Sequence, residues 1–556
     1  METITVQYED GRSEQQPQGT AVGSLLPSPV TANGLPYIAA LVNNDVASLS
    51  YPLTVNSQIR FLTMEDPNGW RIYRRSLCFL LAKAVQDLYP DAQFSVEHSL
   101  GVGLYCSFFT DRQRKCGMTK EILAAIDARM RTFVDRRIPI VRRKIGFTDA
   151  VRQFEESGQK DKLNLLKYRN PPRIVVQWCD GFSDLYHGPL VPDTGVLERF
   201  QLIHYPPGFV IHLPERTDPT NIPPFEDQPQ LFQIIQEHKE WGRILGVSRV
   251  GDLNAIIANR QIEEFILTAE ALHEKKLARI AESIAGARGR IRLVLIAGPS
   301  SSGKTTFAKR LSSHLRVDGL KPVTISTDNY FMGEDRNPRN PDGTPDYEHI
   351  EAVDLALLNE HLAHLVKGQP ADTPIFNFVA RRRDDRSIRM QIEEDQILII
   401  EGIHALNPQL TSQVPAPCKF KIYISALTQL NVDSHNRIST TDNRLMRRIV
   451  RDHKFRGHSA LETLRQWPSV RAGEKRWIFP YQKEADATFN SALDYELAVL
   501  KPTVEALMME VKPSNAEYAE ARRLTEFLLN FLPTSDRPVP GTSILREYIG
   551  GSSFRY

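Results

Sequence analysis

A chain of 556 residues is too long for a single hydrophobic core, so we expect two to four domains. Apolar residues make up 41% and charged residues 24%, which is the composition of a globular protein able to pack such cores. The net charge of +2 gives no support for an overall electrostatic attraction to nucleic acid or membranes, so each basic cluster has to be judged by itself.

Cysteine usage and apolar runs bear on the compartment. The five cysteines include no C-x-x-C pair, which argues against a disulfide framework. The longest apolar runs, such as "QILIIEG", have strand length and fall short of the ~20 residues of a membrane helix. The first residues, "METITVQYEDGRSEQ", are polar where a signal peptide would be apolar. We therefore expect a cytoplasmic protein without membrane contact.

The N-terminal elements are short strands and one long helix. In residues 1–64, "TITVQYEDGR" alternates and then reaches a turn signal at Asp10-Gly11, which predicts a hairpin. From Ile72 to Leu88 apolar residues recur at helical spacing, and Pro90 predicts the end of that helix. "PPRIVVQW" and "GFVIHLP" are typical of strands.

Proline content separates the two halves of the chain. Residues 214–230 contain five prolines and predict a linker, and residues 259–287 follow with an amphipathic helical pattern. Strand and helix patterns alternate from residue 291, which predicts a mostly parallel α/β sheet. The expected fold is multidomain α/β, with domains at 1–64, 65–213, 214–290 (linker and connecting helices), 291–500 and 501–556 (helical tail).

The motif "GPSSSGKT" satisfies G-x-x-x-x-G-K-[ST], with a strand entering it and a helix leaving it. Its glycines let backbone N–H groups surround a phosphate at the positive end of that helix, and its lysine neutralises β/γ oxygens. The motif predicts ATP binding by Gly298, Ser301, Ser302, Gly303, Lys304, Thr305 and Thr306.

Two acidic residues follow later strands. Asp328 comes directly after "KPVTIS", and Glu401 ends the buried run "DQILIIE". Both are expected at the carboxyl edge of the sheet, where α/β folds bind ligands. An acid there can accept the proton of an attacking hydroxyl or hold a metal ion.

The run "DNRLMRRIVRDHKFRG" places Arg444, Arg448 and Arg451 on one helical face, with Arg447 beside them. Two interpretations stay open. Solvated helices often carry such arginines. Alternatively, the helix is a lid that closes over the phosphates and excludes water.

Residues 291–500 resemble the uridine kinase family, and more distantly the phosphoribulokinases. The resemblance rests on six blocks in order: "GPSSSGKTTFA", "STDNYF", "DYEHIEAVDL", "PIFNFVARRR", "ILIIEGIHAL" and "NRLMRRIVRD". It implies ATP or GTP as donor, Mg²⁺ as cofactor and a nucleoside 5′-hydroxyl as acceptor. It implies catalytic roles for Asp328 and Lys304, Mg²⁺ ligation by Thr305, Asp328 and Glu401, and lid arginines at Arg444, Arg447, Arg451 and Arg456.

The acceptor side departs from the family pattern. Glu348 stands where the family has an aspartate that binds the ribose diol, and Phe376 and Arg381 replace a tyrosine and a histidine that read the base. Arginine only donates hydrogen bonds, so it suits the O4 carbonyl of uracil better than the amino group of cytosine. We therefore expect uridine as substrate, bound by Tyr330, Tyr347, Glu348, Phe376, Arg381 and Arg383.

The N-terminal half carries two further resemblances. Residues 1–64 resemble the TGS domain, a β-grasp module, and "YRRSLCFLLAKAVQDLYPDA", "GVGLYCSF" and "DLYHGPLVPDTG" resemble the editing domain of threonyl-tRNA synthetase. The positions of the family's metal ligands hold Arg75, Phe79, Tyr186 and Leu190. None of these is a usual Zn²⁺ ligand, so no zinc is expected there.

Two alternatives stay open at this point. The same kinase chemistry on a sugar phosphate would use the arginines at 381–383 to hold an anionic acceptor. A regulatory RNA-binding protein that uses the nucleotide as a switch is the alternative of another class. The basic run 128–144 could touch RNA phosphates, although such runs are more often solvated helix faces. A homo-oligomer is compatible with the sequence.

Overall fold

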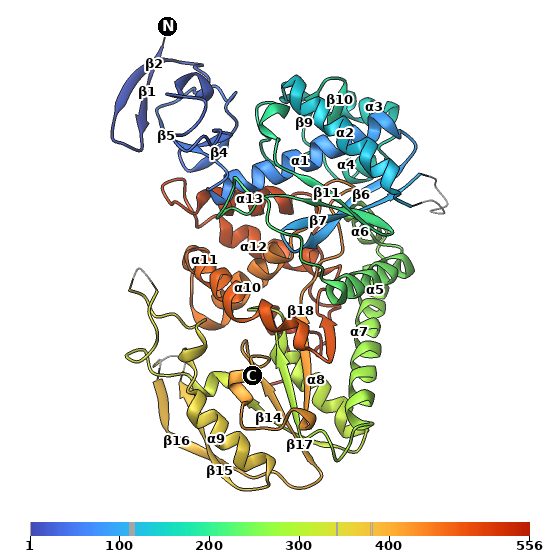
Figure 1. Cartoon of the computed structure of the whole chain (residues 1–556), viewed down its shortest axis with the longest axis vertical. Coiled ribbons are helices and arrows are strands. Elements are labelled where there is room, and N and C mark those ends of the chain that lie inside the picture. The colour runs from blue at the N-terminus through green and yellow to red at the C-terminus, as the bar shows by residue number, and fades with distance from the viewer. Residues whose placement is uncertain (1, 111–116, 341–342, 378–379, 381, 556) are drawn as a thin grey trace. The chain divides into compact units, whose positions relative to one another are not determined.

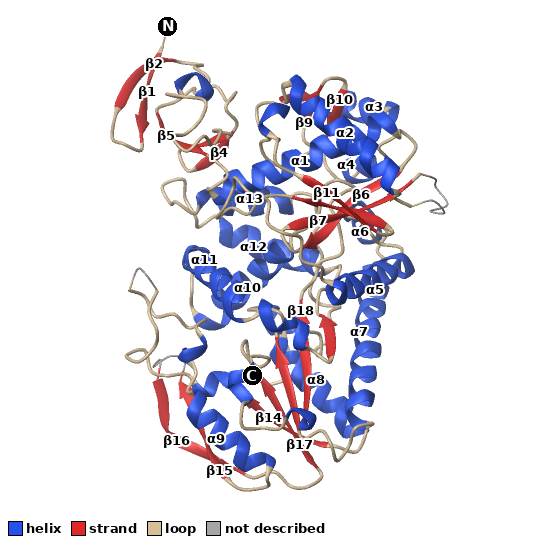
Figure 2. Cartoon of the chain, viewed as in Figure 1, coloured by secondary structure: helices blue, strands red, loops and turns tan. Residues whose placement is uncertain are grey.

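The computed structural model describes residues 2–110, 117–340, 343–377, 380 and 382–555. The chain divides into two compact units (Figures 1 and 2). Unit 1 comprises Met1–Ala258, Gln429–Ser439 and Glu505–Leu532, and unit 2 comprises Asn259–Thr428, Thr440–Val504 and Pro533–Tyr556. Each unit therefore takes segments from distant parts of the chain, whereas the ranges expected from the sequence were continuous.

Unit 1 begins with a mixed five-stranded sheet in the order β2-β1-β5-β3-β4. The strands are β1 (Thr3–Tyr8), β2 (Ser13–Pro17), β3 (Ala39–Val42), β4 (Asp45–Ala47) and β5 (Ser57–Leu62). β1 and β2 pair antiparallel across a turn in which Gly11 has a φ of +84°, which confirms the predicted hairpin. Val6 and Ile59 of neighbouring strands meet in a small buried core with Leu53.

Helix α1 (Pro67–Leu88) organises the next part of unit 1. It begins where the Asp66 carboxylate accepts a hydrogen bond from the Asn68 N–H, and it ends two residues before Pro90, as predicted. Two antiparallel sheets follow, in the orders β11-β12-β7-β6 and β10-β9-β8. Their strands are β6 (Gln93–Leu100), β7 (Gly103–Phe109), β8 (Val141–Gly146), β9 (Arg173–Cys179), β10 (Phe182–Asp184), β11 (Gln201–Tyr205) and β12 (Gly208–His212).

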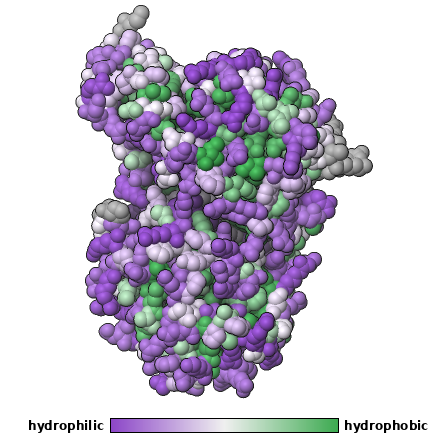
Figure 3. Space-filling view, in the orientation of Figure 1, coloured by the Kyte–Doolittle hydropathy of each residue, from purple (hydrophilic) through white to green (hydrophobic). Residues whose placement is uncertain are grey.

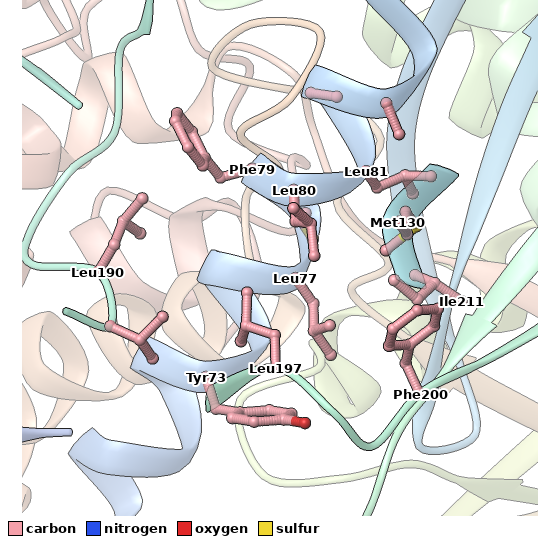
Figure 4. Close-up of a cluster of buried hydrophobic side chains, with 14 of the residues drawn as sticks. Tyr73, Leu77, Phe79, Leu80, Leu81, Met130, Leu190, Leu197, Phe200 and Ile211 are labelled. Atoms are coloured by element: carbon pink, nitrogen blue, oxygen red, sulfur yellow. The ribbon is translucent and has the colours of Figure 1, made fainter. Parts of the chain in front are cut away.

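The largest core of unit 1 lies against α1. Leu77 and Leu81 of α1 pack in one cluster with Met130 of α2 and Ile211 of β12 (Figure 4). The helices of this unit are α2 (Lys120–Arg136), α3 (Phe147–Glu156), α4 (Lys160–Leu166), α5 (Pro229–Leu245), α6 (Val250–Ala258) and α13 (Tyr518–Leu528). The first half of α1 is buried on one face, at Gly69, Ile72 and Tyr73, whereas every residue from Ser76 to Val85 is buried.

Buried ion pairs hold the segment 429–439 inside unit 1. The ammonium group of Lys162 in α4 lies 2.5 Å from a carboxylate oxygen of Asp433 and 3.0 Å from one of Asp184. His435 contacts the second oxygen of Asp184 at 2.5 Å. Both acids and the lysine are fully buried, and the ammonium group offsets part of the charge of the two carboxylates.

Unit 2 is built on a five-stranded sheet in the order β14-β17-β13-β18-β19, and every pairing in it is parallel. This confirms the predicted parallel α/β fold. The strands are β13 (Leu293–Ala297), β14 (Lys321–Ser326), β17 (Gln396–Glu401), β18 (Lys419–Ser425) and β19 (Ala487–Asn490). β13 is fully buried, as a central parallel strand requires.

Helices and a hairpin complete unit 2. They are α7 (Ile262–Ala285), α8 (Lys304–Val317), α9 (Leu355–Val366), the hairpin β15 (Ala371–Asn377) and β16 (Arg382–Met390), α10 (Thr440–Arg456), α11 (Ala460–Trp477), α12 (Glu496–Met508, which runs on into unit 1) and α14 (Arg546–Ile549). Hydrophilic residues predominate on the face shown in Figure 3. Within the described ranges, no helix combines the length and apolar character needed to cross a membrane.

Candidate active site

The P-loop connects β13 to α8. Gly298 follows β13 so closely beside β18 that a Cβ atom there would come within 2.1 Å of the Ile424 carbonyl oxygen. Gly303 caps the start of α8 with a φ of +83°, a conformation that favours glycine. The predicted strand, loop and helix are therefore in place, and the N–H groups at the start of α8 lie at the end of the loop.

Lys304 lies at the first position of α8. Its ammonium group donates a hydrogen bond of 3.3 Å to the carbonyl of Pro299, inside the loop. Burial lowers the pKa of Lys304, and the neighbouring carboxylates of Glu401 and Asp328 oppose that shift. A partly buried ammonium group near two acids is suited to bind the phosphate oxygens of a nucleotide.

Asp328 and Glu401 come together at the carboxyl edge of the sheet. Glu401 is the last residue of β17 and is paired in register with Ser326, the last residue of β14, two positions before Asp328. Burial raises the pKa of Asp328, and burial together with the Asp328 charge raises the pKa of Glu401 to about 7. A buried and a partly buried acid whose charges repel each other form a site suited to a cation.

The residues present fit the Mg²⁺ ion that the family implies. The Thr305 hydroxyl lies 3.4 Å from a carboxylate oxygen of Glu401, and Asp328 is close enough to raise the pKa of Glu401. Hydroxyl and carboxylate oxygens are the ligands that Mg²⁺ prefers. Thr305, Asp328 and Glu401 would hold the ion, which would neutralise the charge of the transferring phosphate.

The carboxyl group of Glu348 lies within electrostatic range of Lys304 and Arg448. One of its carboxylate oxygens is buried and accepts no hydrogen bond from any described residue. Burial raises the pKa of Glu348 to about 7, and the charges of Arg448 and Lys304 oppose that shift. A buried carboxylate oxygen near the P-loop lysine, without a hydrogen-bond donor among the described residues, can accept a hydrogen bond from a ligand.

The other predicted acceptor residues are placed differently. Tyr330 is fully buried, and its hydroxyl contacts His361 at 3.1 Å. Arg383 donates hydrogen bonds of 3.1 Å and 3.2 Å to Asp354. The rings of Phe376 and Tyr347 pack against Phe331 at 5.8 Å and 6.0 Å between centroids. Tyr330, Phe376 and Arg383 are therefore structural in this state, and Arg381 lies outside the described residues.

Two of the predicted lid arginines donate hydrogen bonds to backbone carbonyls of the P-loop. Arg444 is 1% exposed, pairs with Glu474, and donates a hydrogen bond of 2.9 Å to the Ser300 carbonyl. Arg447 is fully buried and pairs with Glu496 at 2.5 Å. Their guanidinium groups are committed to protein acceptors, because a buried arginine requires a paired charge.

The other two lid arginines differ from this pair in the group that their charges affect. Arg451 and Arg456 both act on Asp328, whose pKa their charges lower against the effect of burial. Both also pair with Asp452, at 2.8 Å and 3.6 Å. The structure thus divides the four predicted arginines into a pair that contacts the P-loop backbone and a pair whose charges act on Asp328.

Several site residues were absent from the predicted set. Glu474 and Glu496 neutralise the loop-holding arginines, and Arg448 donates a hydrogen bond of 2.9 Å to the Ser300 hydroxyl. Helical spacing indicated Arg448, which shares the face of Arg444. No local pattern marked the two glutamates, because their burial depends on packing between distant elements.

In unit 1 the positions of the synthetase metal ligands are filled by packing. Phe79, Tyr186 and Leu190 are buried, and Phe79 and Leu190 are part of the core in Figure 4. Arg75 donates a hydrogen bond of 3.0 Å to the Pro189 carbonyl. Across the described ranges, no group of three or more histidine, cysteine, aspartate or glutamate residues is arranged to hold a metal ion.

In comparisons with known proteins, the two halves of the chain match different families. The profile of the Phosphoribulokinase / Uridine kinase family matches residues 293–498. A Threonine--tRNA ligase of Acidithiobacillus ferrooxidans is 35% identical over 167 residues, which are 30% of this chain and 25% of the ligase. The chain thus spans a quarter of the length of that relative, and the matched residues lie in the N-terminal half of this chain.

Two solved structures also align with the chain. One is titled "Structure of a Possible Uridine Kinase from Bacillus stearothermophilus", with 17% identity and a TM-score of 0.28 over 39% of this chain and 98% of that one. The other is a D-glycerate 3-kinase from Cryptococcus neoformans, with 18% identity and a TM-score of 0.21 over 46% and 87%. Residues 293–498 thus form a domain of the Phosphoribulokinase / Uridine kinase family, and the N-terminal region is similar to part of Threonine--tRNA ligases.

Proposed function

We propose that this protein transfers the terminal phosphoryl group of ATP, bound with Mg²⁺, to a hydroxyl group of a small molecule. The observation that carries the proposal is the convergence of Lys304, Asp328 and Glu401, together with Thr305, at one edge of the parallel sheet. Phosphoryl transfer needs little covalent chemistry from a protein. It needs cations on the phosphates and a base that positions the attacking hydroxyl.

Asp328 is the proposed base. Its burial raises its pKa, which increases its affinity for the proton of an attacking hydroxyl. The Arg451 and Arg456 charges limit that rise, so the carboxylate form stays accessible. Lys304 would bind the phosphate oxygens. Arg444, through its hydrogen bond to the P-loop backbone, would keep the loop rigid.

The acceptor we propose is the 5′-hydroxyl of a nucleoside, with uridine preferred. The support comes from Glu348, whose unsatisfied carboxylate oxygen can accept hydrogen bonds from a ribose diol. Asp354 neutralises Arg383, which removes one of the three arginines that would hold a sugar phosphate. A neutral acceptor is therefore favoured over an anionic one.

A contact between the N-terminal region and RNA is a second proposal, favoured by the similarity of this region to Threonine--tRNA ligases. Within the basic run, however, Arg129 pairs with Asp87 at 2.8 Å and Arg136 pairs with Asp180 at 3.2 Å. These pairs reduce the charge available to phosphates. Filter binding with tRNA at low and physiological salt tests this proposal, because phosphate contacts weaken steeply as salt rises.

The acceptor proposal is tested by Glu348→Ala. Loss of a charged hydrogen-bond acceptor should raise the KM for uridine about 10- to 100-fold. The KM for ATP should stay within about 2-fold. The matched control is Glu351→Ala, which removes an exposed carboxylate three residues away and should change neither constant. An unchanged KM for uridine in Glu348→Ala would exclude Glu348 from the acceptor site.

A further inference from the structure

A short segment of the chain far from the P-loop in sequence covers it in space. Residues 543–549, which we call the strap, include α14 and belong to unit 2. A Cβ atom on Gly303 would come within 2.4 Å of the Ile544 side chain and 3.5 Å of the Tyr548 hydroxyl. The second glycine of the P-loop therefore permits a close approach of the strap as well as the turn of the loop.

The strap places a carboxylate on the first turn of α8. One oxygen of Glu547 accepts a hydrogen bond of 3.2 Å from the Thr306 N–H and another of 2.7 Å from the Thr306 hydroxyl. Thr306 is the third residue of α8, and Gly303 at the N-cap position has no side chain with which to cap it. Glu547 therefore supplies the cap and places a negative charge at the positive end of the helix.

The groups that Glu547 occupies are those that a nucleotide needs. In a P-loop the N–H groups at the start of the helix cradle the α- and β-phosphates. The Thr306 N–H cannot donate a full hydrogen bond to a carboxylate and to a phosphate at once. The two anions would also repel each other across a short distance in a partly buried site. The Glu547 carboxylate and a nucleotide phosphate therefore cannot both bind the Thr306 N–H.

The strap is fastened to α10, the helix of the arginines. The Tyr548 ring lies 5.2 Å from the guanidinium carbon of Arg447, and the Lys454 ammonium group donates a hydrogen bond of 2.5 Å to the Ile549 carbonyl. The Tyr548 ring is fully buried. These contacts hold the strap in place with its carboxylate already in the cradle, so it needs no large movement to compete with a nucleotide.

We propose that the strap is an autoinhibitory element that competes with the nucleotide for the P-loop, and that Glu547 must leave Thr306 before ATP can bind fully. The inference rests on the proposed function of the P-loop as the ATP site. It adds a regulated step to that function, since any event that loosens the strap from α10 would raise the affinity for ATP.

The test is the ATP dissociation constant of the full chain with Mg²⁺, measured by calorimetry. Glu547→Gln keeps the size of the side chain and removes its charge, and we expect about 10-fold tighter ATP binding. Glu547→Ala should bind at least as tightly. The matched control is Asp318→Asn, which removes one negative charge at the opposite end of α8 and should leave the affinity unchanged.

The outcomes separate the two proposals. If the wild type binds ATP in a Lys304-dependent manner and Glu547→Gln binds equally or more weakly, the strap proposal fails and the ATP site stands. If no variant binds ATP, both fail. Hydrogen exchange of the wild type gives a second measurement that requires no variant. ATP should accelerate the exchange of the amides of residues 543–549, and slower or unchanged exchange would show that the strap remains in place as a fixed wall.

Discussion

Replacing Arg444 by methionine tests whether this arginine stabilises the P-loop or binds the phosphates of the nucleotide as part of a lid. Arg444 is 1% exposed, and its partner Glu474 is 0% exposed. The substitution leaves Glu474 with Arg471, at 2.9 Å, as its remaining ion-pair partner. Removal of one member of a buried pair typically costs ~3–5 kcal/mol because the other charge stays desolvated. The loss of the hydrogen bond to Ser300 adds to this cost.

The assay is calorimetric unfolding of the wild type, Arg444→Met and the double variant Arg444→Met/Glu474→Leu. For a unit of this size, we expect the single variant to lower the Tm by about 6–20 °C. The double variant should recover most of the loss, because both buried charges are gone and Arg471 is partly exposed. A stability loss below about 1 kcal/mol, together with a large fall in phosphoryl transfer, would refute the support role and restore the lid interpretation of Arg444.

Three further predictions concern the catalytic groups. Asp328→Asn should reduce phosphoryl transfer at least ~100-fold while the Kd for ATP stays nearly constant; a loss of a few-fold would remove Asp328 from the mechanism. Lys304→Ala should weaken both ATP affinity and turnover, and unchanged values of both would contradict the P-loop assignment. Burial raises the pKa of Glu348 above its usual 4.5 to about 7, so its stabilising contribution is full below pH 4.5 and is lost as pH rises through 7. Glu348→Gln should therefore gain stability relative to the wild type at pH 8 but not at pH 4, as urea unfolding at the two pH values would show.

The parts of the fold that were predictable carry local signals. The P-loop lies within one strand, one turn and one helix, and Asp328 and Glu401 each come at the end of a strand-length apolar run. Parallel strands bring their carboxyl ends to one edge, so the meeting of the two acids follows from the fold class. The hairpin at Gly11 and the end of α1 before Pro90 were predictable for the same reason.

The interactions around the P-loop were beyond sequence reasoning because they join distant residues. Glu474 lies 30 positions from Arg444, Glu496 lies 49 positions from Arg447, and Glu547 lies 241 positions from Thr306. A charged residue at helical spacing usually faces solvent, and only packing reveals that Glu474 and Glu496 are buried and that Glu547 is partly buried. Residues 429–439 likewise belong to unit 1, where the buried Lys162–Asp433 ion pair holds them. No sequence pattern predicts this pair.

The measurement that tests the central proposal most directly is acceptor-dependent release of ADP from Mg²⁺-ATP. The acceptors are uridine, cytidine, adenosine, guanosine, ribose 5-phosphate and ribulose 5-phosphate, each assayed with the wild type and with Asp328→Asn as the control for contaminating kinases. We expect uridine to give the highest kcat/KM, cytidine a lower value, and Asp328→Asn to abolish both. Turnover of a sugar phosphate but not of any nucleoside, or ADP release independent of every acceptor, would contradict the assignment of a nucleoside kinase.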